Sequence, residues 1–506
     1  MSLEPGPGSV TPPIAIAGDA GTASGRLTAP LVLLDDTFLA RLAEVCSDVL
    51  LDPTHLAEAS RDWWPLAMIW ATQGEVGQVA GALARPASVE EVAAVLRLCH
   101  ETRVPVTPAG GRSSVVGGTV PVHGGVLLDL TALSGIVDVD QTSGIVEVLA
   151  GTFGDSFEAE LAASHGLTVG HWPQSMTLST VGGWLACRGA GQLSNRYGKI
   201  EDIVMGVEVV LPDGRTIRTG GQPREAVGPD LTRVFVGSEG TLGVITRAWL
   251  QAWPTPPHQA RSAWGFATFE GALEAMRHIA RRGATPAVMR LYDGIESERN
   301  FGVDPSVNVL LVFDEGDQLM VDAGMAVAAQ ECERADADRL ADELVERWFG
   351  HRNDVSALEA FISKGYVVDT LEVSAPWSKL DVVYAKALEA IRDVPGTLLA
   401  SCHQSHSYPT GGCLYFTFGA QVEPEERGSY YRAVWDAGTR AVLASGGSLS
   451  HHHGVGLNRA RFVPEALGGG LGVLTAIKAA LDPNGVCNPG KLGLPDAYGG
   501  PGWPPR

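Results

Sequence analysis

Three consecutive histidines are the side chains in this sequence best suited to move protons or to bind a metal. They lie in the run SLSHHHGVG (448–456) as His451, His452 and His453, and the whole chain of 506 residues has only 13 histidines. Imidazole titrates near neutral pH and is also a common metal ligand. The run therefore has three interpretations, which are a metal site, an acid–base site and a polar loop without chemistry.

Three glycine-rich segments indicate a second kind of chemistry, the binding of a large anionic cofactor. They read PAGGRSSVVGG (108–118), STVGGWLACRGAGQLSNRYGKIEDIV (179–204) and GSEGTLGVIT (237–246). Such loops expose successive backbone N–H groups, which can surround a pyrophosphate. The first segment is neither GxGxxG nor a Walker loop, and alone it would indicate only turns. Together, the three segments predict one extended cofactor held mainly by the backbone.

Charge and composition restrict the possible partners and the compartment. The chain has 58 acidic residues against 37 lysines and arginines, a formal net charge of −21. Nucleic acid is therefore not an expected partner, because binding phosphate backbones requires a basic surface. The seven cysteines are scattered and form no CxxC pair, as expected of reduced thiols. Neither a secretory signal nor a membrane-spanning apolar run is evident, so we expect a cytoplasmic protein.

Local patterns predict the elements of the first half of the chain. Residues 1–33 begin with a segment rich in Gly, Pro, Ala and Thr, which predicts a flexible arm. Ser88 and Glu91 have the spacing of a capping box ahead of an amphipathic helix. Strands are predicted at 125–130 and 144–151, and another directly precedes the first glycine-rich loop.

The composition changes at the run PTPP (254–257), where we place a domain boundary. Beyond it, helices alternate with strands as in an α+β domain. The expected helices cover 269–283, 320–348, 379–393 and 424–444, and the expected strands cover 308–313, 397–402 and 413–419.

As a set, these motifs resemble the vanillyl-alcohol oxidase / p-cresol methylhydroxylase (PCMH) superfamily. The resemblance rests on PAGGRSS, on TVGGW with its following RYG and ED, on GSEGTLGVIT, and on the ending DPNGVCNPGKLG. It implies an α+β fold with a two-subdomain PCMH-type FAD-binding domain and an α+β cap. The expected domains are the arm (1–33), the FAD-binding domain (34–255), the cap or substrate domain (256–450) and a C-terminal active-site loop and segment (451–506) that returns to the FAD-binding domain.

The resemblance also implies which residues hold the FAD. Some relatives bind FAD covalently through a histidine in or near the pyrophosphate loop, but this loop carries Arg112 and no histidine, and His123 lies past it. We therefore predict noncovalent FAD. The expected FAD-binding residues are Pro108, Ala109, Gly110, Gly111, Arg112, Ser113, Ser114, Ser175, Thr180, Gly182, Gly183, Tyr197, Asp202, Glu239, Gly240, Gly243, Val244 and Ile245.

One branch of the superfamily would make the histidine run a metal site. In its metal-assisted 2-hydroxy-acid dehydrogenases, a HxGDGNxH segment and a glutamate directly before HGVG hold a divalent ion. Here the corresponding strand reads YPTGGCLYFTF (408–418), and the position before HGVG is His452. The sequence shows neither the paired histidines nor the carboxylate, so we expect no metal.

Another branch, the alkyldihydroxyacetonephosphate synthases, makes the run an acid–base site. These enzymes form the ether bond of ether lipids without net redox change, which requires a group that moves protons at the reacting carbon. The segments similar to this branch are MRLYD (289–293), EVSAPW (372–377), GGCLYF (411–416) and ASGGSLSHHHGVG (444–456).

The resemblance to the synthases implies five catalytic residues, which are Tyr415, His451, His452, His453 and Arg290. A tyrosine or histidine would move the proton, and the Arg290 guanidinium would hold a phosphate or orient the site. Taken singly, Tyr415 on an apolar strand would be a core tyrosine. Within the matching motifs we interpret it as catalytic.

The synthase pattern departs from this sequence at its phosphate-binding arginine. The matching position before SAPW is Leu358, and Arg352 lies six residues earlier. Either an insertion has shifted the arginine to Arg352, or phosphate is recognised in another way. We expect Arg352 and Arg290 to bind the substrate.

These observations predict an FAD-dependent alkyl transferase that exchanges the acyl chain of acyl-dihydroxyacetone phosphate for a fatty alcohol. The alternative is an FAD-dependent oxidase or dehydrogenase of an alcohol or 2-hydroxy acid. A protein that binds FAD without catalysis is less favoured, because Tyr415 and the histidines accompany the cofactor loops. A lipid-like or small-molecule substrate, a possible peripheral membrane contact and a homodimer are expected. The segment WWPLAMIWA (63–71) either lines an apolar tunnel or packs in the core.

Overall fold

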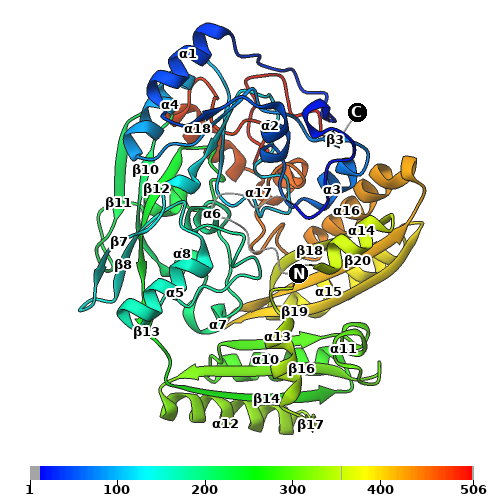
Figure 1. The fold of residues 1–506 in the computed structure, drawn as a ribbon. Helices are drawn as coiled ribbons and strands as arrows, with labels where there is room; N and C mark the ends of the chain where they lie inside the picture. The colour runs from blue at the N-terminus through cyan, green and yellow to red at the C-terminus, as the bar shows by residue number, and fades with distance from the viewer. Residues whose placement is uncertain (1–11, 355, 504–506) are drawn as a thin grey trace.

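Three larger β-sheets organise the protein, a computed structural model that describes residues 12–354 and 356–503 (Figure 1). The first has four strands, in the order β2 (Val49–Leu50), β4 (Ala82–Ala84), β6 (Val126–Asp129) and β5 (Val106–Ala109). Its β4–β6 and β5–β6 pairs are parallel. Helices α1 (Asp36–Val45) and α4 (Val89–Thr102) pack on it through one apolar core. Ser88 caps α4 as predicted, by accepting the N–H of Glu91.

The second sheet has five antiparallel strands and forms the other half of the N-terminal region. Its order is β11 (Thr216–Gly220), β10 (Val204–Val210), β12 (Val244–Gln251), β8 (Ile145–Leu149) and β7 (Ile136–Asp140). Strands β10 and β11 form a hairpin that turns at Pro212, Asp213 and Gly214. Helices α5 (Gly154–His165) and α6 (Val181–Cys187) share its apolar core.

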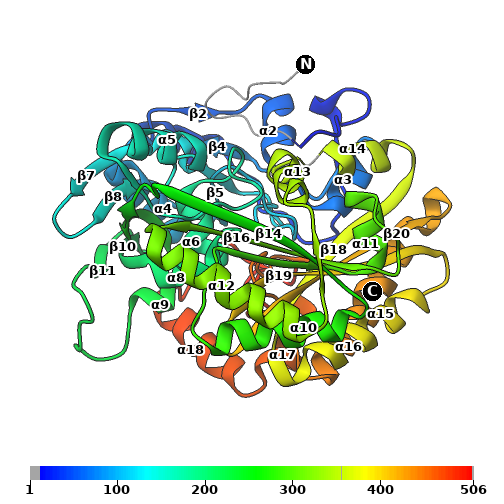
Figure 2. The same ribbon diagram turned by 90° about the horizontal axis from the view of Figure 1, so that it is seen from below.

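The third sheet has seven antiparallel strands and lies C-terminal to the proline-rich boundary. Its order is β17 (Asp338–Leu340), β14 (His258–Phe266), β16 (Asn308–Gly316), β15 (Val288–Tyr292), β19 (Thr397–Tyr408), β20 (Gly411–Gln421) and β18 (Tyr366–Pro376). Helices α10 (Phe269–Arg281) and α12 (Gln318–Arg334) cover its β14–β16 end (Figure 2). Helices α15 (Trp377–Arg392) and α16 (Arg427–Ala444) cover its β18–β20 end. The α+β class is confirmed.

Shorter elements connect the sheets. The helices are α2 (Pro53–Ala59), α3 (Pro65–Ala71), α7 (Ser194–Tyr197), α8 (Ile200–Ile203), α9 (Thr232–Phe235), α11 (Gly294–Phe301), α13 (Glu343–His351), α14 (Ser356–Ser363), α17 (Val463–Leu467) and α18 (Gly470–Leu481). The strands are β1 (Ser24–Gly25), β3 (Glu75–Val76), β9 (Leu167–Thr168) and β13 (Trp253–Pro254), and single 3-10 turns lie at Ala20–Thr22, Leu130–Ala132, Pro424–Glu426 and Ala460–Phe462.

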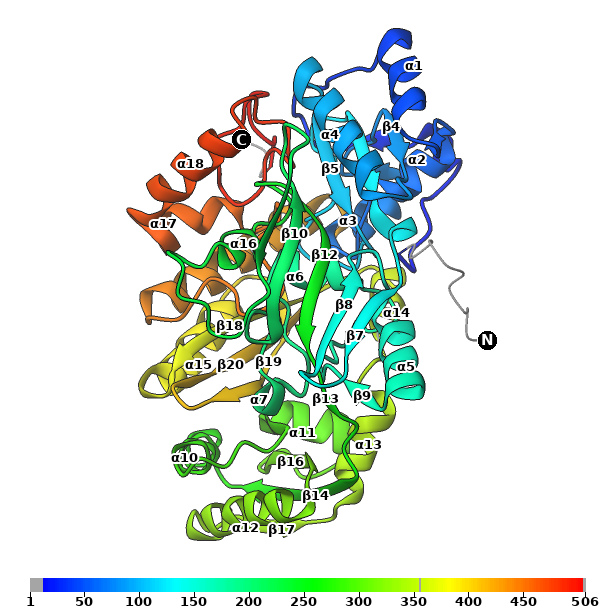
Figure 3. The ribbon, with the colours of Figure 1, turned by 90° about the vertical axis from the view of Figure 1, so that its left-hand side faces the viewer.

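The C-terminal segment returns to the first two sheets. Figure 3 shows α17 and α18 beside the β10 side of the second sheet. Leu474 and Ile477 of α18 pack against the core of that sheet, and Val106 of the first sheet forms a bridge with Cys487. The histidine run therefore leaves the third sheet and enters a segment anchored on the other two.

Two predictions about the fold are wrong. The arm is ordered from residue 12 to residue 33, because Ile14, Ile16 and Leu27 are buried in the core around Trp64; residues 1–11 lie outside the described residues. The helix expected over 320–348 is two helices separated by strand β17. Asp336 adopts a left-handed φ of 54°, which an α-helix does not tolerate, and this ends α12.

Among the described residues, no helix is both long and apolar enough to cross a membrane. The run at 63–71 is not such a segment either. Residues 65–71 of this run form α3, and all of them are buried in the protein core. From the whole run, Trp63 and Pro65 line the cavity described below.

Candidate functional site

Side chains and loops from all three sheets line one cavity of about 1030 Å³. All but two of the residues expected to bind FAD are part of the lining. They are Pro108, Ala109, Gly110, Gly111, Arg112, Ser113, Ser114, Ser175, Thr180, Gly182, Gly183, Glu239, Gly240, Gly243, Val244 and Ile245.

The first glycine-rich loop leaves no room for side chains where it passes the second. A Cβ on Gly111 would lie 1.9 Å from the carbonyl oxygen of Leu178, and one on Gly110 would lie 2.3 Å from the hydroxyl oxygen of Thr180. Real Cβ contacts are never so short, so both positions require glycine. The close packing presents the backbone of this loop directly to the cavity.

Polar atoms in the lining fit a large polar cofactor. Nε of Arg112, Oγ1 of Thr119 and Oε1 of Gln192 are buried without a hydrogen-bond partner among the described residues. Buried polar groups normally have a partner, so these three atoms match a ligand that carries both donors and acceptors. Phosphates and a polar heterocycle meet that requirement, and the residues present therefore fit FAD.

Three residues named in the sequence analysis have other partners. Tyr197 donates to Glu315 at 2.9 Å, and Asp202 accepts the N–H of Lys199 at 3.1 Å; neither lines the cavity. His123 lies 2.8 Å from the carbonyl oxygen of Pro30 and 2.8 Å from Asp496, and it does not line the cavity either. This agrees with noncovalent FAD, which stays a prediction.

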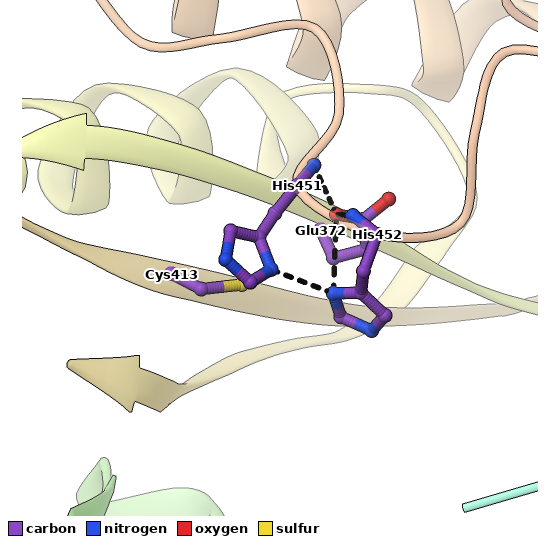
Figure 4. A group of neighbouring side chains, drawn as sticks. All are labelled: Glu372, Cys413, His451 and His452. Carbon is purple, nitrogen blue, oxygen red and sulfur yellow. Dashed lines mark hydrogen bonds and ion pairs between the residues drawn. The ribbon is translucent and has the colours of Figure 1, made fainter. Parts of the chain in front are cut away.

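The histidine run is held by a carboxylate that the sequence analysis missed. Glu372 of β18 accepts the backbone N–H groups of His451 and His452 at 2.5 and 2.9 Å (Figure 4). It accepts the backbone N–H of His453 as well, at 3.0 Å. It also accepts the guanidinium of Arg459 at 2.7 Å, with both side chains fully buried. Burial alone would raise the pKa of Glu372, but the opposing interactions, led by the charge of Arg459, hold it well below its usual range. The carboxylate is therefore ionised.

The same carboxylate bears on the metal interpretation. Glu372, Cys413, His451 and His452 bring potential ligand atoms within 4.8 Å of one another. The two oxygens of Glu372 already accept five donors, the fifth being the hydroxyl of Ser450. A carboxylate whose lone pairs are occupied in this way is a poor metal ligand. The sequence analysis considered only the position directly before HGVG, which is His452, and did not find Glu372, which lies near the run from another strand and shapes the loop.

The other end of the histidine run is anchored on a cofactor loop. Glu239, in the third glycine-rich segment, accepts the N–H groups of Val455 and Gly456 at 2.6 and 2.7 Å. Its side chain therefore positions the run, and Glu239 is also one of the residues that line the cavity. His452 and His453 line the same cavity, whereas His451 lies behind them.

Burial keeps the imidazoles neutral. It lowers the pKa of His451 to about 3 and that of His453 to about 4, and it places the pKa of His452 well below the usual range. Neutral imidazole can accept a proton at its free nitrogen. The two cavity-facing histidines are therefore unprotonated at neutral pH, and each has a ring nitrogen that can accept a hydrogen bond or a proton.

Tyr415 of β20 faces these imidazoles. Its ring stacks on His403 with centroids 4.7 Å apart, and its hydroxyl oxygen accepts the Thr370 hydroxyl at 3.0 Å. Burial raises the pKa of Tyr415, so the phenol keeps its proton. Because its oxygen already accepts from Thr370, its own O–H is available as a donor in the cavity.

Arg290 of β15 is fixed in one orientation by a buried network. Its Nε donates to the hydroxyl of Tyr292 at 2.7 Å, and its Nη2 lies 2.6 Å from Nε2 of His403. Nδ1 of His403 lies 2.8 Å from Glu296. Burial and Arg290 lower the pKa of His403 to about 4, so the neutral ring donates to Glu296 and accepts from Arg290. Among the described residues, Nη1 of Arg290 has no partner and is free for a ligand.

Arg352 supplies a second guanidinium to the lining. Its Cζ lies 4.8 to 5.7 Å from the ring centroids of Phe349, Trp172 and Trp348, and its buried Nη1 has no partner among the described residues. Arg290 lies against the same Trp348 ring, at 6.0 Å. Burial lowers the pKa of Arg352, but a guanidinium stays charged. The unpartnered Nη1 can donate to an anionic group of a ligand in the cavity.

An apolar part of the lining comes from α14 and the adjoining ends of β18 and β19. It consists of Leu358, Phe361, Val368, Leu398 and Leu399. Two of these side chains also reach the surface, since Phe361 is 47% exposed and Leu398 is 68% exposed. The cavity thus joins polar cofactor loops, two arginines and an apolar outlet.

Several functional residues were missed by sequence reasoning. His403 and His406 both line the cavity, although residues three apart on a regular strand face opposite sides. A register shift between Gln404 and His406 brings both to the same side. The density of polar residues in the buried strand SCHQSHSY (401–408) was the available signal.

Comparisons with known proteins agree with this arrangement. Residues 80–220 match the family model for an FAD binding domain, and residues 255–492 match that for the C-terminal domain of FAD linked oxidases. The FAD-linked oxidoreductase YgcU of Escherichia coli O157:H7 is 31% identical, over 82% of this chain and 89% of its own length.

Two further comparisons concern one enzyme. The alkyldihydroxyacetonephosphate synthase of Dictyostelium discoideum is 29% identical, over 82% of this chain and 74% of its own length. A solved structure of an alkyldihydroxyacetonephosphate synthase superposes with a TM-score of 0.76 at 24% identity, covering 92% of this chain and 87% of that one. The structural likeness shows the shared fold.

The fold and the cavity define a flavoprotein in which a two-sheet cofactor domain and a cap enclose one site. The chain belongs to the FAD-linked oxidase family, and its cofactor is FAD.

Proposed function

We propose that this protein is an FAD-dependent alkyl transferase that replaces the acyl chain of acyl-dihydroxyacetone phosphate with a fatty alcohol. The observation that carries the proposal is the composition of the cavity. One continuous lining combines the FAD loops, the guanidinium groups of Arg290 and Arg352, and an apolar outlet; Nη1 of Arg352 is buried without a partner among the described residues. A substrate with a phosphate and a long hydrocarbon chain matches both features, whereas a small hydroxy acid would not fill the outlet.

The residues present would divide the work as follows. The guanidinium groups of Arg290 and Arg352 both lie against the Trp348 ring, and they would hold the phosphate through their free N–H groups. The bond from the reacting carbon to the acyl oxygen breaks, and a bond to the alcohol oxygen forms. The fatty acid departs as a carboxylate, and the alcohol gives up its proton.

Proton movement would fall to the histidines and the tyrosine. The neutral imidazoles of His452 and His453 would accept protons from the reacting carbon and from the alcohol. The Tyr415 hydroxyl would donate a hydrogen bond to the departing carboxylate. FAD, when bound, supplies a ring that can exchange electrons with the reacting carbon and lower the barrier to breaking its bond.

The second candidate is oxidation of an alcohol or 2-hydroxy acid. It is supported by the similarity to YgcU, an uncharacterized FAD-linked oxidoreductase, and by the same neutral imidazoles. In such a reaction a histidine of the cavity would take the hydroxyl proton, and FAD, when bound, would supply the hydride acceptor. The arginines would bind the carboxylate of the acid.

The apolar outlet also supports the expected contact with lipid. We infer that Phe361 and Leu398 lie where a lipid surface would deliver the chains, because both are exposed and both line the cavity. The homodimer and the cytoplasmic location stay predictions.

The proposal is tested on the purified holoprotein without oxygen. It is mixed with a long-chain acyl-dihydroxyacetone phosphate and a fatty alcohol, and the products are followed by mass spectrometry. An alkyl ether with one equivalent of free fatty acid supports the proposal. No ether, together with reduction of the flavin by an alcohol or 2-hydroxy acid, would favour the second candidate.

A further inference from the structure

A chain of hydrogen bonds runs behind the wall of the cavity and joins two of its histidines. Nδ1 of His452 lies 2.9 Å from Nδ1 of His451, and Nε2 of His451 lies 3.0 Å from the Tyr408 hydroxyl. That hydroxyl lies 3.2 Å from Oγ of Ser194, which lies 2.7 Å from Nδ1 of His406. His452 and His406 line the cavity, whereas the three residues between them do not.

The two ends of this chain lie close together. The ring centroids of His452 and His406 are 5.2 Å apart, and each ring has one nitrogen, Nε2, outside the chain. Because both residues line the cavity and their rings lie this close together, one bound substrate can contact both. The middle of the chain is shielded, since Ser194 is 1% exposed and His451 is 7% exposed. Solvent has little access to the protons that it carries.

We propose that these five residues form a proton relay, in which one cavity histidine takes a proton from the substrate and the other returns a proton to it. The inference rests on the proposed function, because alkyl exchange moves protons at two places in one cavity. One proton leaves the alcohol, and another moves at the reacting carbon. A relay lets both events occur without a path to solvent.

The proton balance of the relay closes without any charged member. In one orientation, each group donates forward: His452 through Nδ1–H, His451 through Nε2–H, and then the two hydroxyls. When Nε2 of His452 accepts a proton, each group passes its own proton onward, and Nε2 of His406 releases one. One proton enters, one leaves, and no electron moves. The reverse orientation works in the same way.

The surroundings favour a neutral relay over a charged histidine. Burial lowers the pKa of His406 and of His452 well below the usual range, and it lowers that of His451 to about 3. The ammonium of Lys199, which donates to the carbonyl oxygen of His451 at 2.6 Å, adds positive charge beside the chain. Glu372 lies 3.5 Å from Nδ1 of His452, but its oxygens are already occupied by five donors.

The middle of the relay can be broken without changing the cavity lining. Tyr408→Phe and Ser194→Ala each remove one hydroxyl and leave every cavity-facing residue in place. We expect either variant to bind FAD normally and to lower kcat for ether formation by about 100-fold, the lower end of what acid–base catalysis contributes, with KM nearly unchanged. The matched control is Tyr430→Phe, which removes a buried hydroxyl 2.9 Å from Thr397, outside the cavity.

The double variant separates a relay from two independent effects. If both hydroxyls belong to one relay, Tyr408→Phe with Ser194→Ala loses no more kcat than either single variant. Losses that multiply would overturn the relay, as would a single variant with the kcat of the wild type. If one single variant no longer retains FAD, the kcat of the other single variant decides whether the relay takes part in catalysis.

A second measurement needs no substrate. Histidine side chains of the ¹⁵N-labelled holoprotein report their tautomers by NMR. A continuous relay requires that His451 and His406 carry their protons on the same ring nitrogen, both Nε2 or both Nδ1, and opposite tautomers would overturn it. If the wild type forms no ether, the proposed function fails, and this result still decides whether the relay exists.

Discussion

The removal of one charge at Glu372 tests how the histidine run is held in place. In Glu372→Gln the side chain keeps its shape but loses its charge, which leaves the fully buried guanidinium of Arg459 unpaired. The new amide nitrogen also presents a donor to backbone N–H groups that, in the wild type, donate to a carboxylate oxygen of Glu372. If the remaining oxygen faces Arg459, the amide faces the N–H groups of His451 and His452.

The size of the effect follows from these contacts. Breaking a buried ion pair by removing one partner costs about 3 to 5 kcal/mol. Because the run packs as a unit, this cost falls mainly on the local stability of residues 448–459. Hydrogen exchange of the backbone amides, followed by mass spectrometry, measures that stability directly. We expect exchange in this segment to be faster by about a hundred- to several thousand-fold, at about tenfold per 1.4 kcal/mol.

Two controls make the result interpretable. Glu465→Gln alters an exposed glutamate and should leave exchange unchanged. Glu372→Gln with Arg459→Met removes both buried charges and should recover part of the lost protection. Exchange in β10 reports any global unfolding. Unchanged protection of residues 448–459 in Glu372→Gln would refute the role given to this carboxylate.

Further predictions concern the substrate, the proton donor, the cofactor loop and pH. Arg352→Met should raise KM for the phosphate substrate at least about tenfold, since one charge-assisted hydrogen bond contributes about 1.5 to 3 kcal/mol. The control Arg440→Gln, on the surface, should not change KM. An unchanged KM for Arg352→Met would exclude phosphate binding at Arg352. Tyr415→Phe should keep FAD but lower kcat by about 100-fold or more, and near-normal turnover would remove the hydroxyl from the mechanism. Gly111→Ala should purify without FAD, seen as a loss of absorbance near the flavin maximum, because its Cβ would meet the Leu178 carbonyl; a yellow protein would contradict the packing argument. The folded-state pKa of Glu372 lies below its unfolded value of about 4.3, so the stability that its charge contributes is complete above that pH and is lost as the pH falls through the folded-state pKa. The unfolding free energies of the wild type and Glu372→Gln, measured at a series of falling pH values, should therefore converge. A difference that stays constant with pH would contradict the prediction.

The sequence predicted the parts of the site that depend on residues close to one another in the chain. The glycine-rich loops were recognised because close backbone approach excludes side chains, as Gly110 and Gly111 illustrate. Arg352 was proposed from a shifted position, and its guanidinium does line the cavity. The helices and strands with clear periodicity were also found.

The parts that were missed depend on tertiary structure. Glu372 is 79 residues from His451 in the chain, and the two meet because the segment before the run lies along β18, where the N–H of Ser448 donates to the carbonyl oxygen of Ser374 at 2.7 Å. His406 reaches the cavity through a register shift, which no periodicity reveals. Tyr197 and Asp202 were assigned by resemblance, but their contacts lie with Glu315 and with the backbone of Lys199.

The central claim is that the alcohol replaces the acyl chain without net oxidation. The most direct measurement supplies the holoprotein with acyl-dihydroxyacetone phosphate and a fatty alcohol labelled with ¹⁸O, while recording the flavin spectrum over many turnovers. The account predicts label in the ether product, none in the released fatty acid, and an unchanged flavin redox state. Bleaching of the flavin in step with conversion of the alcohol to an aldehyde, with no labelled ether, would contradict it.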